Sequence, residues 1–214
     1  MKVRIGILDY GMGNRRSVQK AFEHVGAIAT ITNDHNQLSS ADGLVVPGVG
    51  AFPKAMRNLN ELGLARLIRE HAEQQRPVLG ICLGMQLLFD SSDELGHTPG
   101  LGLISGNVTA LDTGGLRVPH MGWNDVRFER PSALTSQLPR LGCPFYHVHS
   151  FSAHPQWAEV VTATCEYGVR FATVVSRGLV HGVQFHPEKS SAHGLKLLAN
   201  FVALCAGQAR AQAA

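Results

Sequence analysis

Apolar runs alternate with amphipathic segments through the first half of the chain. Four apolar runs have the length and continuity of buried parallel strands: residues 3–8, 27–31, 43–46 and 77–81. Three segments between them predict helices, the second of them short: residues 15–25, 33–41 and 64–75. Gly26 stands where a helix C-cap is expected. This βαβα order predicts an α/β fold with a doubly wound, mostly parallel sheet and flanking helices.

The pattern changes after about residue 100. Six short apolar or alternating runs predict strands: residues 104–111, 126–128, 145–151, 160–165, 171–175 and 179–185. One more helix is expected over residues 194–206. We therefore expect antiparallel strands and a β-ribbon added to the parallel core. Residues 1–206 form a single predicted domain, and the small and polar residues 207–214 a frayed tail.

Composition narrows the possible classes of function. The 214 residues are 44% hydrophobic and 16% charged, which suits one domain with a sizeable core. A net charge of +3 without a Lys/Arg run argues against nucleic-acid binding. The N-terminal residues predict a strand rather than a signal peptide, and no apolar run is long enough for a membrane helix. Four cysteines without paired spacing predict reduced thiols and a cytoplasmic protein.

The segment Gly80-Ile81-Cys82-Leu83-Gly84-Met85-Gln86 carries the strongest chemical signal. It follows a predicted strand, and we expect a helix to open at residues 86–89. Gly-x-Cys-x-Gly between a strand and a helix is the cysteine form of a nucleophile elbow. The strained turn should expose the Cys82 sulfur to solvent at a helix N-terminus, which favours thiolate, with the Leu83 N–H as an oxyanion donor. The alternative is a buried structural cysteine.

A candidate base follows the predicted strand 179–185. Pro187 should hold His186 in an extended conformation, in which residues two apart face the same way. Glu188 can then bond Nδ1 of His186 and leave Nε2 to take the proton of Cys82. Alone, His-Pro-Glu is more often a strand end. Together with the cysteine elbow it predicts a Cys-His-Glu triad.

These two motifs resemble those of the class I (triad) glutamine amidotransferases. Four further segments resemble, more narrowly, the family of glutaminase subunits of imidazole glycerol phosphate synthases: 9–14, 47–52, 119–124 and 187–190. The resemblance covers residues 3 to 205 in the expected order. It implies a flavodoxin-like fold and an enzyme that hydrolyses L-glutamine to glutamate and ammonia. It also implies a cyclase subunit that uses the ammonia to make imidazole glycerol phosphate and AICAR in histidine biosynthesis.

The resemblance also assigns residues around the triad. It points to the Val49 N–H as a second oxyanion donor beside that of Leu83. Gly48 and Gly50 flank Val49, contribute to the substrate site and allow its peptide to flip, although an ordinary strand-to-helix turn is the alternative. The amino and carboxylate groups of glutamine are expected to be held by four further residues: Gln86, His149, Ser150 and Phe151.

A partner is expected because the second half-reaction is missing. No phosphosugar site is evident, and a (β/α)₈ barrel would need about 250 further residues. The resemblance implies a heterodimer with the cyclase subunit, and our interface candidates are Asn14, Arg15, Trp123 and Lys189. For Trp123 the alternative is a core position, and for Arg15 it is a solvated helix face. No metal or cofactor is expected, because His147 and His149 alone are a weak metal signal.

The chain departs from the family in one place. His147 stands where an apolar or aromatic residue is expected, and Phe151 where Tyr is common. Three rival functions stay open. Another triad amidotransferase subunit, such as that of anthranilate or aminodeoxychorismate synthase, is disfavoured by Met85 and by residues 119–124. A stand-alone hydrolase or cysteine peptidase is the second. A catalytically inactive regulatory subunit, the third, is disfavoured because all three triad residues are present.

Overall fold

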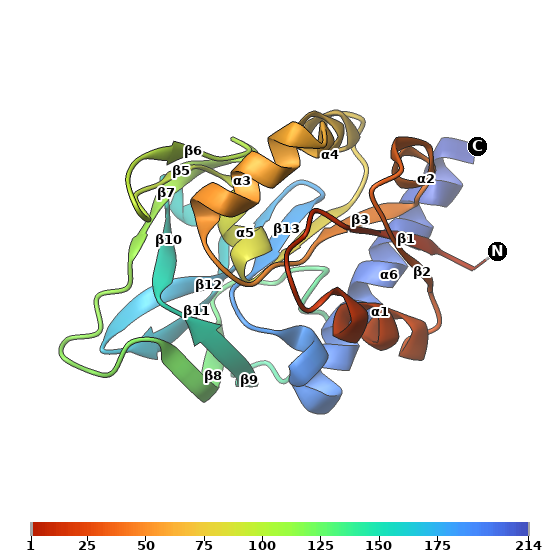
Figure 1. Ribbon diagram of the computed structural model, residues 1–214. Helices are drawn as coiled ribbons and strands as arrows, with labels where there is room; N and C mark the ends of the chain where they lie inside the picture. The colour runs from red at the N-terminus through yellow and green to blue at the C-terminus, as the bar shows by residue number, and fades with distance from the viewer. Residues whose placement is uncertain (1, 214) are drawn as a thin grey trace.

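A nine-stranded sheet forms the centre of the protein (Figure 1). The structure is a computed structural model that describes residues 2–213. The strand order is β2-β1-β3-β4-β13-β12-β11-β8-β9. The first five strands are parallel: β2 Ile28–Thr32, β1 Arg4–Leu8, β3 Gly43–Val46, β4 Val78–Ile81 and β13 Val180–Val183. The other four join antiparallel: β12 Val169–Arg177, β11 Val161–Tyr167, β8 His120–Phe128 and β9 Cys143–His149.

A second sheet of four strands packs beside the first, in the order β10-β7-β5-β6. Its strands are β10 Phe151–Pro155, β7 Ile104–Ala110, β5 Phe89–Ser92 and β6 Thr98–Pro99. Only Ser150 separates β9 from β10, so the chain passes from one sheet to the other at that residue. The antiparallel additions expected from the sequence are therefore present in both sheets.

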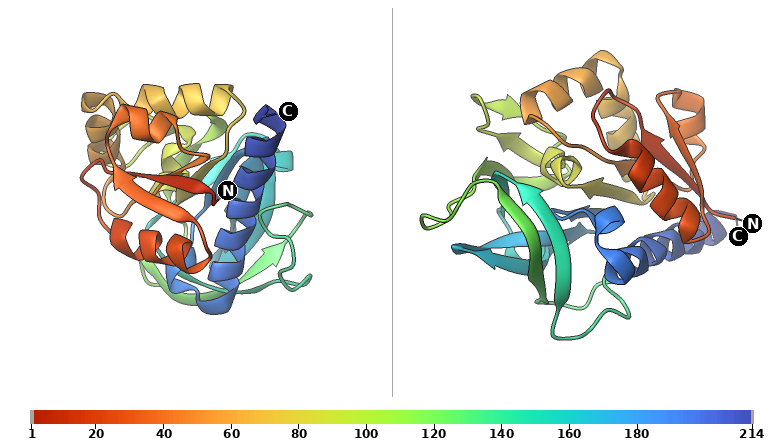
Figure 2. Two further views of the ribbon diagram at one scale, coloured as in Figure 1. Left: turned by 90° about the vertical axis from the view of Figure 1, so that its right-hand side faces the viewer. Right: turned by 60° about the horizontal axis from the view of Figure 1, so that its bottom comes forward.

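Helices cover both faces of the parallel strands (Figure 2). On one face, α1 Arg15–His24 and α6 Ser191–Ala213 bury Phe22 and Phe201 against the sheet. Four helices cover the other face: α2 His35–Ser39, α3 Phe52–Glu61, α4 Leu64–Glu73 and α5 Leu83–Leu87. Two 3₁₀ turns, η1 Ala158–Val160 and η2 Pro187–Lys189, complete the chain. The doubly wound α/β fold is confirmed.

Two helices differ from the sequence expectation. Helix α3 was not predicted, although Phe52, Ala55, Met56 and Leu59 have helical spacing and are all buried. The prediction that a helix opens at residues 86–89 was wrong. Helix α5 begins at Leu83 and ends at Leu87, and Phe89 begins a strand. The helix stops because the N–H groups of Leu101 and Ile104 bond the carbonyls of Leu87 and Leu88 and draw the chain into the second sheet.

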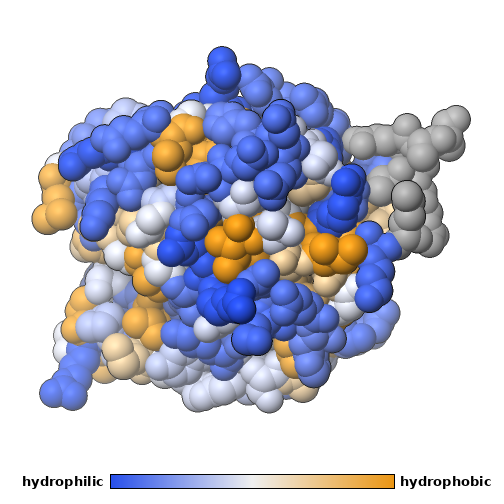
Figure 3. Space-filling model, turned by 45° about the vertical axis from the view of Figure 1, so that its right-hand side comes forward, coloured by the Kyte–Doolittle hydropathy of each residue, from blue (hydrophilic) through white to orange (hydrophobic). Residues whose placement is uncertain are grey.

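The C-terminal helix is longer than expected. Helix α6 runs to Ala213 rather than ending at Ala206, and fraying of the tail in solution stays a prediction. The side of the molecule turned forward in Figure 3 is mainly hydrophilic, with hydrophobic residues in small separate groups. Within residues 2–213, none of the helices combines the length and apolar character that a membrane crossing requires.

The topology brings the predicted catalytic motifs to one edge of the sheet. Strands β4 and β13 are parallel neighbours, and Ile81 lies opposite Val183. The Cys82 N–H continues this pairing with a 2.8 Å bond to the Val183 carbonyl. Because both strands end here, Cys82 and His186 emerge side by side at the carboxyl edge, where ligands of such sheets bind.

Candidate active site

The turn at Cys82 has the geometry of a nucleophile elbow. Cys82 has φ 56° and ψ −111°, a conformation that non-glycine residues rarely adopt. Glycine is required on both sides of it. A Cβ on Gly80 would lie 2.4 Å from the Gly84 carbonyl oxygen, and one on Gly84 would lie 1.7 Å from that of Val46. The strained turn expected from the sequence is therefore present, with α5 beginning directly after the cysteine.

Cys82 is buried rather than turned toward solvent, so that part of the expectation was wrong. Its exposed fraction is 5%, because strand β9 covers the sulfur. The thiol donates to the Val148 carbonyl at 3.6 Å, and the Gln184 side-chain amide donates to Sγ at 3.9 Å. Cys82 instead faces a cavity of about 290 Å³, which also exposes Leu83 and Val49. This cavity gives a small substrate access to the sulfur.

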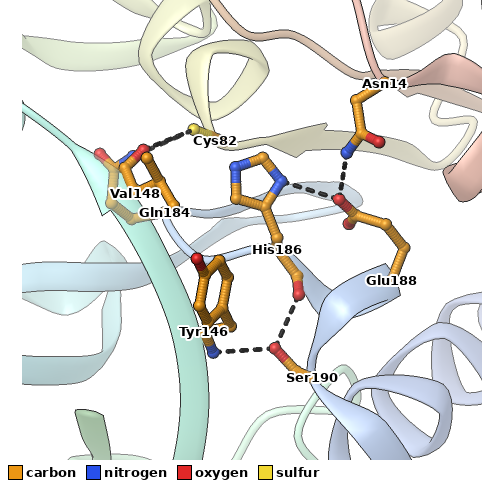
Figure 4. Close-up of polar contacts among 8 residues, drawn as sticks. All are labelled: Asn14, Cys82, Tyr146, Val148, Gln184, His186, Glu188 and Ser190. Carbon is orange, nitrogen blue, oxygen red and sulfur yellow. Dashed lines mark hydrogen bonds and ion pairs between the residues drawn. The ribbon is translucent and has the colours of Figure 1, made fainter. Parts of the chain in front are cut away.

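His186 and Glu188 form the expected pair. His186 Nδ1 lies 2.8 Å from Glu188 Oε1, and both side chains are almost fully buried. Figure 4 shows the other ring nitrogen on the side of Cys82. The backbone differs from the expectation in one respect. Only His186 is extended, with φ −101° and ψ 94°, and Glu188 returns to the ring through the 3₁₀ turn η2.

The His186 ring is in an environment that favours its protonated form. Burial alone would lower the pKa of His186, but hydrogen bonding to Cys82 and Glu188 and the negative charges of both raise it to about 10. Asn14 strengthens the pair, because its amide also donates to Glu188 Oε1 (Figure 4). The second oxygen, Oε2, is buried and has no hydrogen-bond partner among the residues that the structure describes. An imidazolium beside the sulfur is the arrangement that stabilises a reactive thiolate.

Ser190 fixes the backbone that carries His186. Its hydroxyl donates to the His186 carbonyl at 2.6 Å and accepts the Tyr146 N–H at 3.0 Å (Figure 4). The His186 N–H in turn donates to the Tyr146 carbonyl at 2.8 Å. Sequence reasoning missed this role, although Ser190 lies in a segment that carries the family resemblance. The three bonds tie the catalytic turn to strand β9.

The second half of the loop at residues 47–50, Val49 and Gly50, lines the cavity. The Val49 side chain is 39% exposed, and Gly50 has φ +118°. The Tyr10 hydroxyl, which sequence reasoning also missed, donates to the Pro47 carbonyl and anchors the start of the loop. Burial, followed by the charge of Cys82, raises the pKa of Tyr10, which keeps the phenol a donor. A Cβ on Gly48 would lie 2.6 Å from the Tyr10 oxygen, so glycine is needed there.

All of the expected substrate contacts except Gly48 line the same cavity. Its walls include Gln86 and the run His149, Ser150 and Phe151. The Gln86 amide donates to the Phe151 carbonyl at 3.1 Å and to Gln184 Oε1 at 3.0 Å. Three further wall residues were not expected from the sequence: Glu94, Pro119 and Val148. Glu94 follows β5, Pro119 precedes β8 and Val148 lies in β9. Local sequence patterns do not reveal how these strands are placed relative to the cavity.

The comparison with protein families matches the geometry. Residues 6–205 match the family of class-I glutamine amidotransferases. The chain belongs to this family.

Three relatives narrow the comparison within the amidotransferase family. All are imidazole glycerol phosphate synthase subunits HisH. That of Moorella thermoacetica is 53% identical and aligns over 92% of this chain and 93% of its own. That of Geobacillus kaustophilus is 50% identical and aligns over 95% of this chain and 98% of its own. That of Methanosarcina mazei is 48% identical over 94% and 99%. This amidotransferase therefore also belongs to the family of HisH subunits.

Solved structures support the fold of this amidotransferase. A solved glutamine amidotransferase superposes with a TM-score of 0.71 at 22% identity, over 94% of this chain and 98% of its own. PurLQS from Thermotoga maritima superposes with a TM-score of 0.77 at 20% identity, over 95% and 99%. At these identities the likeness shows the fold alone.

The predicted interface residues of this amidotransferase fall into two groups. Trp123 is 54% exposed rather than in the core, and its ring centroid lies 6.1 Å from that of Tyr146. Lys189 Nζ lies 5.9 Å from the centre of the same Tyr146 ring, so these three side chains share one surface. Asn14 instead points inward to Glu188, and Arg15 forms an ion pair with Asp9.

His147, His149 and the three cysteines other than Cys82 are packed side chains. Among residues 2–213, no group of three or more His, Cys, Asp or Glu side chains is arranged to hold a metal ion. His147 and His149 instead hydrogen bond to protein groups. Cys143, Cys165 and Cys205 are buried and free, as expected.

Proposed function

We propose that Cys82, His186 and Glu188 hydrolyse the side-chain amide of L-glutamine. The observation that carries the proposal is the buried His186–Glu188 pair beside the strained Cys82 turn. The sulfur attacks the amide carbon and forms a tetrahedral intermediate. His186 then gives its Nε2 proton to the departing nitrogen, which leaves as ammonia. Water, deprotonated by His186, attacks the resulting thioester, and glutamate leaves with the thiol restored.

The oxyanion of each intermediate needs two donors. Leu83 begins α5, and the first N–H groups of a helix have no partner within it, so the Leu83 N–H is the first donor. We assign the second to the Val49 N–H. Gly48 and Gly50 permit the rotation that would aim this N–H at the cavity, while the Tyr10 hydroxyl holds Pro47 in place.

This loop motivates a gating hypothesis. Glutaminase activity is expected to be low in the isolated chain and to rise when the cyclase subunit binds its nucleotide. Glutamate release with and without the cyclase subunit and an acceptor analogue tests the idea. Equal rates under the two conditions would end it.

The amino-acid part of glutamine is proposed to bind across the cavity from the sulfur. Gln86 and the backbone of residues 149–151 supply the polar groups there, and Gly50 lines the cavity beside Val49. The cavity of about 290 Å³ suits a single small amino acid.

Ammonia is proposed to pass to a cyclase subunit that makes imidazole glycerol phosphate and AICAR. Released into water, ammonia would be protonated and lost, so the partner must cover the cavity. The exposed apolar side chains of Val118, Met121 and Trp123 lie on or just before β8, close to the cavity wall residue Pro119. Trp, Tyr and Arg are the side chains that anchor interfaces most often. Together with Lys189, Asn14 and Arg15, this face is our proposed interface.

A reconstitution experiment tests the proposed function. Mixing the chain with a cyclase subunit, the acceptor nucleotide and glutamine should yield imidazole glycerol phosphate, and omitting either protein should stop it. A chain that instead supports anthranilate synthesis, or hydrolyses peptides, would establish a rival function. The four free cysteines and the thiol nucleophile suit a reducing compartment, and we propose the cytoplasm.

A further inference from the structure

Buried histidines that the triad chemistry does not use lie beside the cavity. His120 on β8 and His147 and His149 on β9 are each no more than 5% exposed. The His120 ring is stacked between His147 and Tyr167, at centroid distances of 4.9 and 4.1 Å. Burial lowers the pKa of His120 and of His149 to about 4, so both rings are neutral near pH 7.

The partners of these rings determine which nitrogen carries each proton. A neutral imidazole has one N–H donor and one acceptor nitrogen. His149 Nδ1 lies 2.9 Å from the Phe151 carbonyl oxygen, which can only accept, so Nδ1 is protonated and Nε2 is an acceptor. His120 Nδ1 lies 2.9 Å from that Nε2 and must donate to it. His120 Nε2 then accepts from the Asn124 amide nitrogen at 3.2 Å.

These bonds form one directed chain from strand β8 to the cavity wall. It runs from the Asn124 amide through His120 and His149 to the Phe151 carbonyl. That carbonyl also accepts from Gln86 Nε2, so both of its lone pairs are in use. The second N–H of the Gln86 amide donates to Gln184 Oε1. Among the residues that the structure describes, none donates a hydrogen bond to Gln86 Oε1, an acceptor suited to the ammonium group of an amino acid.

His147 supports the chain without joining it. Its Nδ1 donates to the Phe145 carbonyl at 3.1 Å, so its Nε2 accepts from the Thr173 hydroxyl at 3.0 Å. Both nitrogens are therefore occupied, and the ring is held as a flat surface against His120. The side chain that departs from the family expectation thus fixes the plane of the central ring of the chain.

We propose that His120 and Asn124 are positioning residues for substrate glutamine, which act through His149 to orient the Phe151 carbonyl and the Gln86 amide. The inference rests on the proposed function, because it concerns the binding of the same amino acid. Neither residue touches the substrate. Their effect should therefore appear in the binding of glutamine rather than in the chemistry at Cys82.

The variant His120→Phe tests the proposal. Phenylalanine keeps the stacking against His147 and Tyr167 and removes both hydrogen bonds. In the complex with the cyclase subunit, we expect the KM for glutamine to rise about tenfold, the effect of losing about one buried hydrogen bond. The kcat should change much less, and synthesis from ammonium salts should equal that of the unaltered chain. His154→Phe is the matched control, since His154 is exposed on β10 and bonds Thr109 outside the chain. Its KM should not change.

An unchanged KM in a folded His120→Phe protein would overturn the proposal. A loss of kcat at constant KM would do the same. Nitrogen-15 NMR of the unaltered protein gives a second test that does not depend on the folding of a variant. It should show His120 and His149 protonated at Nδ1, and a proton on Nε2 of either would contradict the chain. If the unaltered complex fails to hydrolyse glutamine, the proposed function fails instead, whatever the NMR shows.

Discussion

Glu188 shows how a single carboxylate is used at the site. One oxygen accepts hydrogen bonds from the His186 ring and from the Asn14 amide, whereas the other is buried and has no partner within residues 2–213. Burying a carboxylate without hydrogen-bond donors would destabilise the folded protein, and the two hydrogen bonds to Oε1 offset part of that cost. The negative charge is also one cause of the raised pKa of His186. The charge and the shape of Glu188 can therefore be separated experimentally.

Replacing Glu188 by Gln keeps the shape and removes the charge. We expect kcat to fall by about 100-fold or more, because the carboxylate no longer stabilises the imidazolium or selects the tautomer of the neutral ring. The alkaline limb of the profile of kcat/KM against pH reports loss of the His186 proton. It should move to lower pH, because the charge that helps raise the pKa to about 10 is gone. Glutaminase assays from pH 6 to pH 11 measure both effects.

Asn14→Ala is the matched control for this experiment. It removes one hydrogen bond from Oε1 but leaves the carboxylate charge, so the alkaline limb should move less than in Glu188→Gln. An unchanged limb in Glu188→Gln would show that the carboxylate does not set the pKa of His186.

The strand β4, the Cys82 turn and helix α5 form an element without spare room. Gly80 lets its backbone approach that of Gly84, and Gly84 lets its backbone approach that of Val46. The chain can therefore reverse at Cys82 and place the Leu83 N–H beside the sulfur. The helix that follows has five residues, so its geometry depends on the packing around it rather than on its own helix propensity. We expect this element to tolerate added atoms poorly.

Gly84→Ala tests this packing. Because its Cβ would lie 1.7 Å from the Val46 carbonyl oxygen, we expect a loss of at least about 3 kcal/mol in the free energy of unfolding, measured in urea. Gly207→Ala is the matched control, since no atom of the described residues lies within 4 Å of its Cβ. In a formed helix it should stabilise by up to about 1 kcal/mol. A Gly84→Ala protein as stable as the unaltered chain would contradict the close approach, and no gain from Gly207→Ala would favour the frayed tail.

Local patterns predicted the elements whose signal lies within a few residues. Strand β3 has the predicted bounds 43–46, and the Cys82 turn and the His186–Glu188 pair follow from short motifs. Helix α5 was placed wrongly because the short apolar run 87–89 suits a helix or a strand, and pairing of Phe89 with the distant β7 decides for a strand. Asn14 was missed as a partner of Glu188 because 174 residues separate them. Such contacts depend on topology, which a local pattern does not contain.

At the scale of the whole molecule, several histidines are buried in neutral form. Burial lowers the pKa of His120, His149 and His181 to about 4 and that of His71 to about 3. In the unfolded chain each would titrate near its ordinary value of about 6.5. Between these values the unfolded state binds more protons than the folded state, so acidification favours unfolding. His186, whose pKa is raised, is protonated in both states well below pH 6.5 and adds little slope there.

The stability of the protein should therefore fall as the pH falls below about 6.5. Each of these histidines contributes up to about 1.4 kcal/mol per pH unit. Urea midpoints at pH 7.5, 6.5, 5.5 and 5.0 measure the effect in a range where few carboxylates titrate. His120→Phe should reduce the slope, because it removes one of the groups. Midpoints that stay constant from pH 6.5 to pH 5.0 would show that these histidines are not buried in neutral form.

The most direct test of the whole account uses Cys82→Ala in the complex with the cyclase subunit. Imidazole glycerol phosphate synthesis is measured once with glutamine and once with ammonium salts as the nitrogen source. We predict that glutamine no longer supports synthesis, because no sulfur remains to attack the amide, and that ammonium supports it at the unaltered rate. Synthesis that continues with glutamine, or that is lost with both nitrogen sources, would contradict the assignment of Cys82 as the nucleophile of a separate glutaminase site.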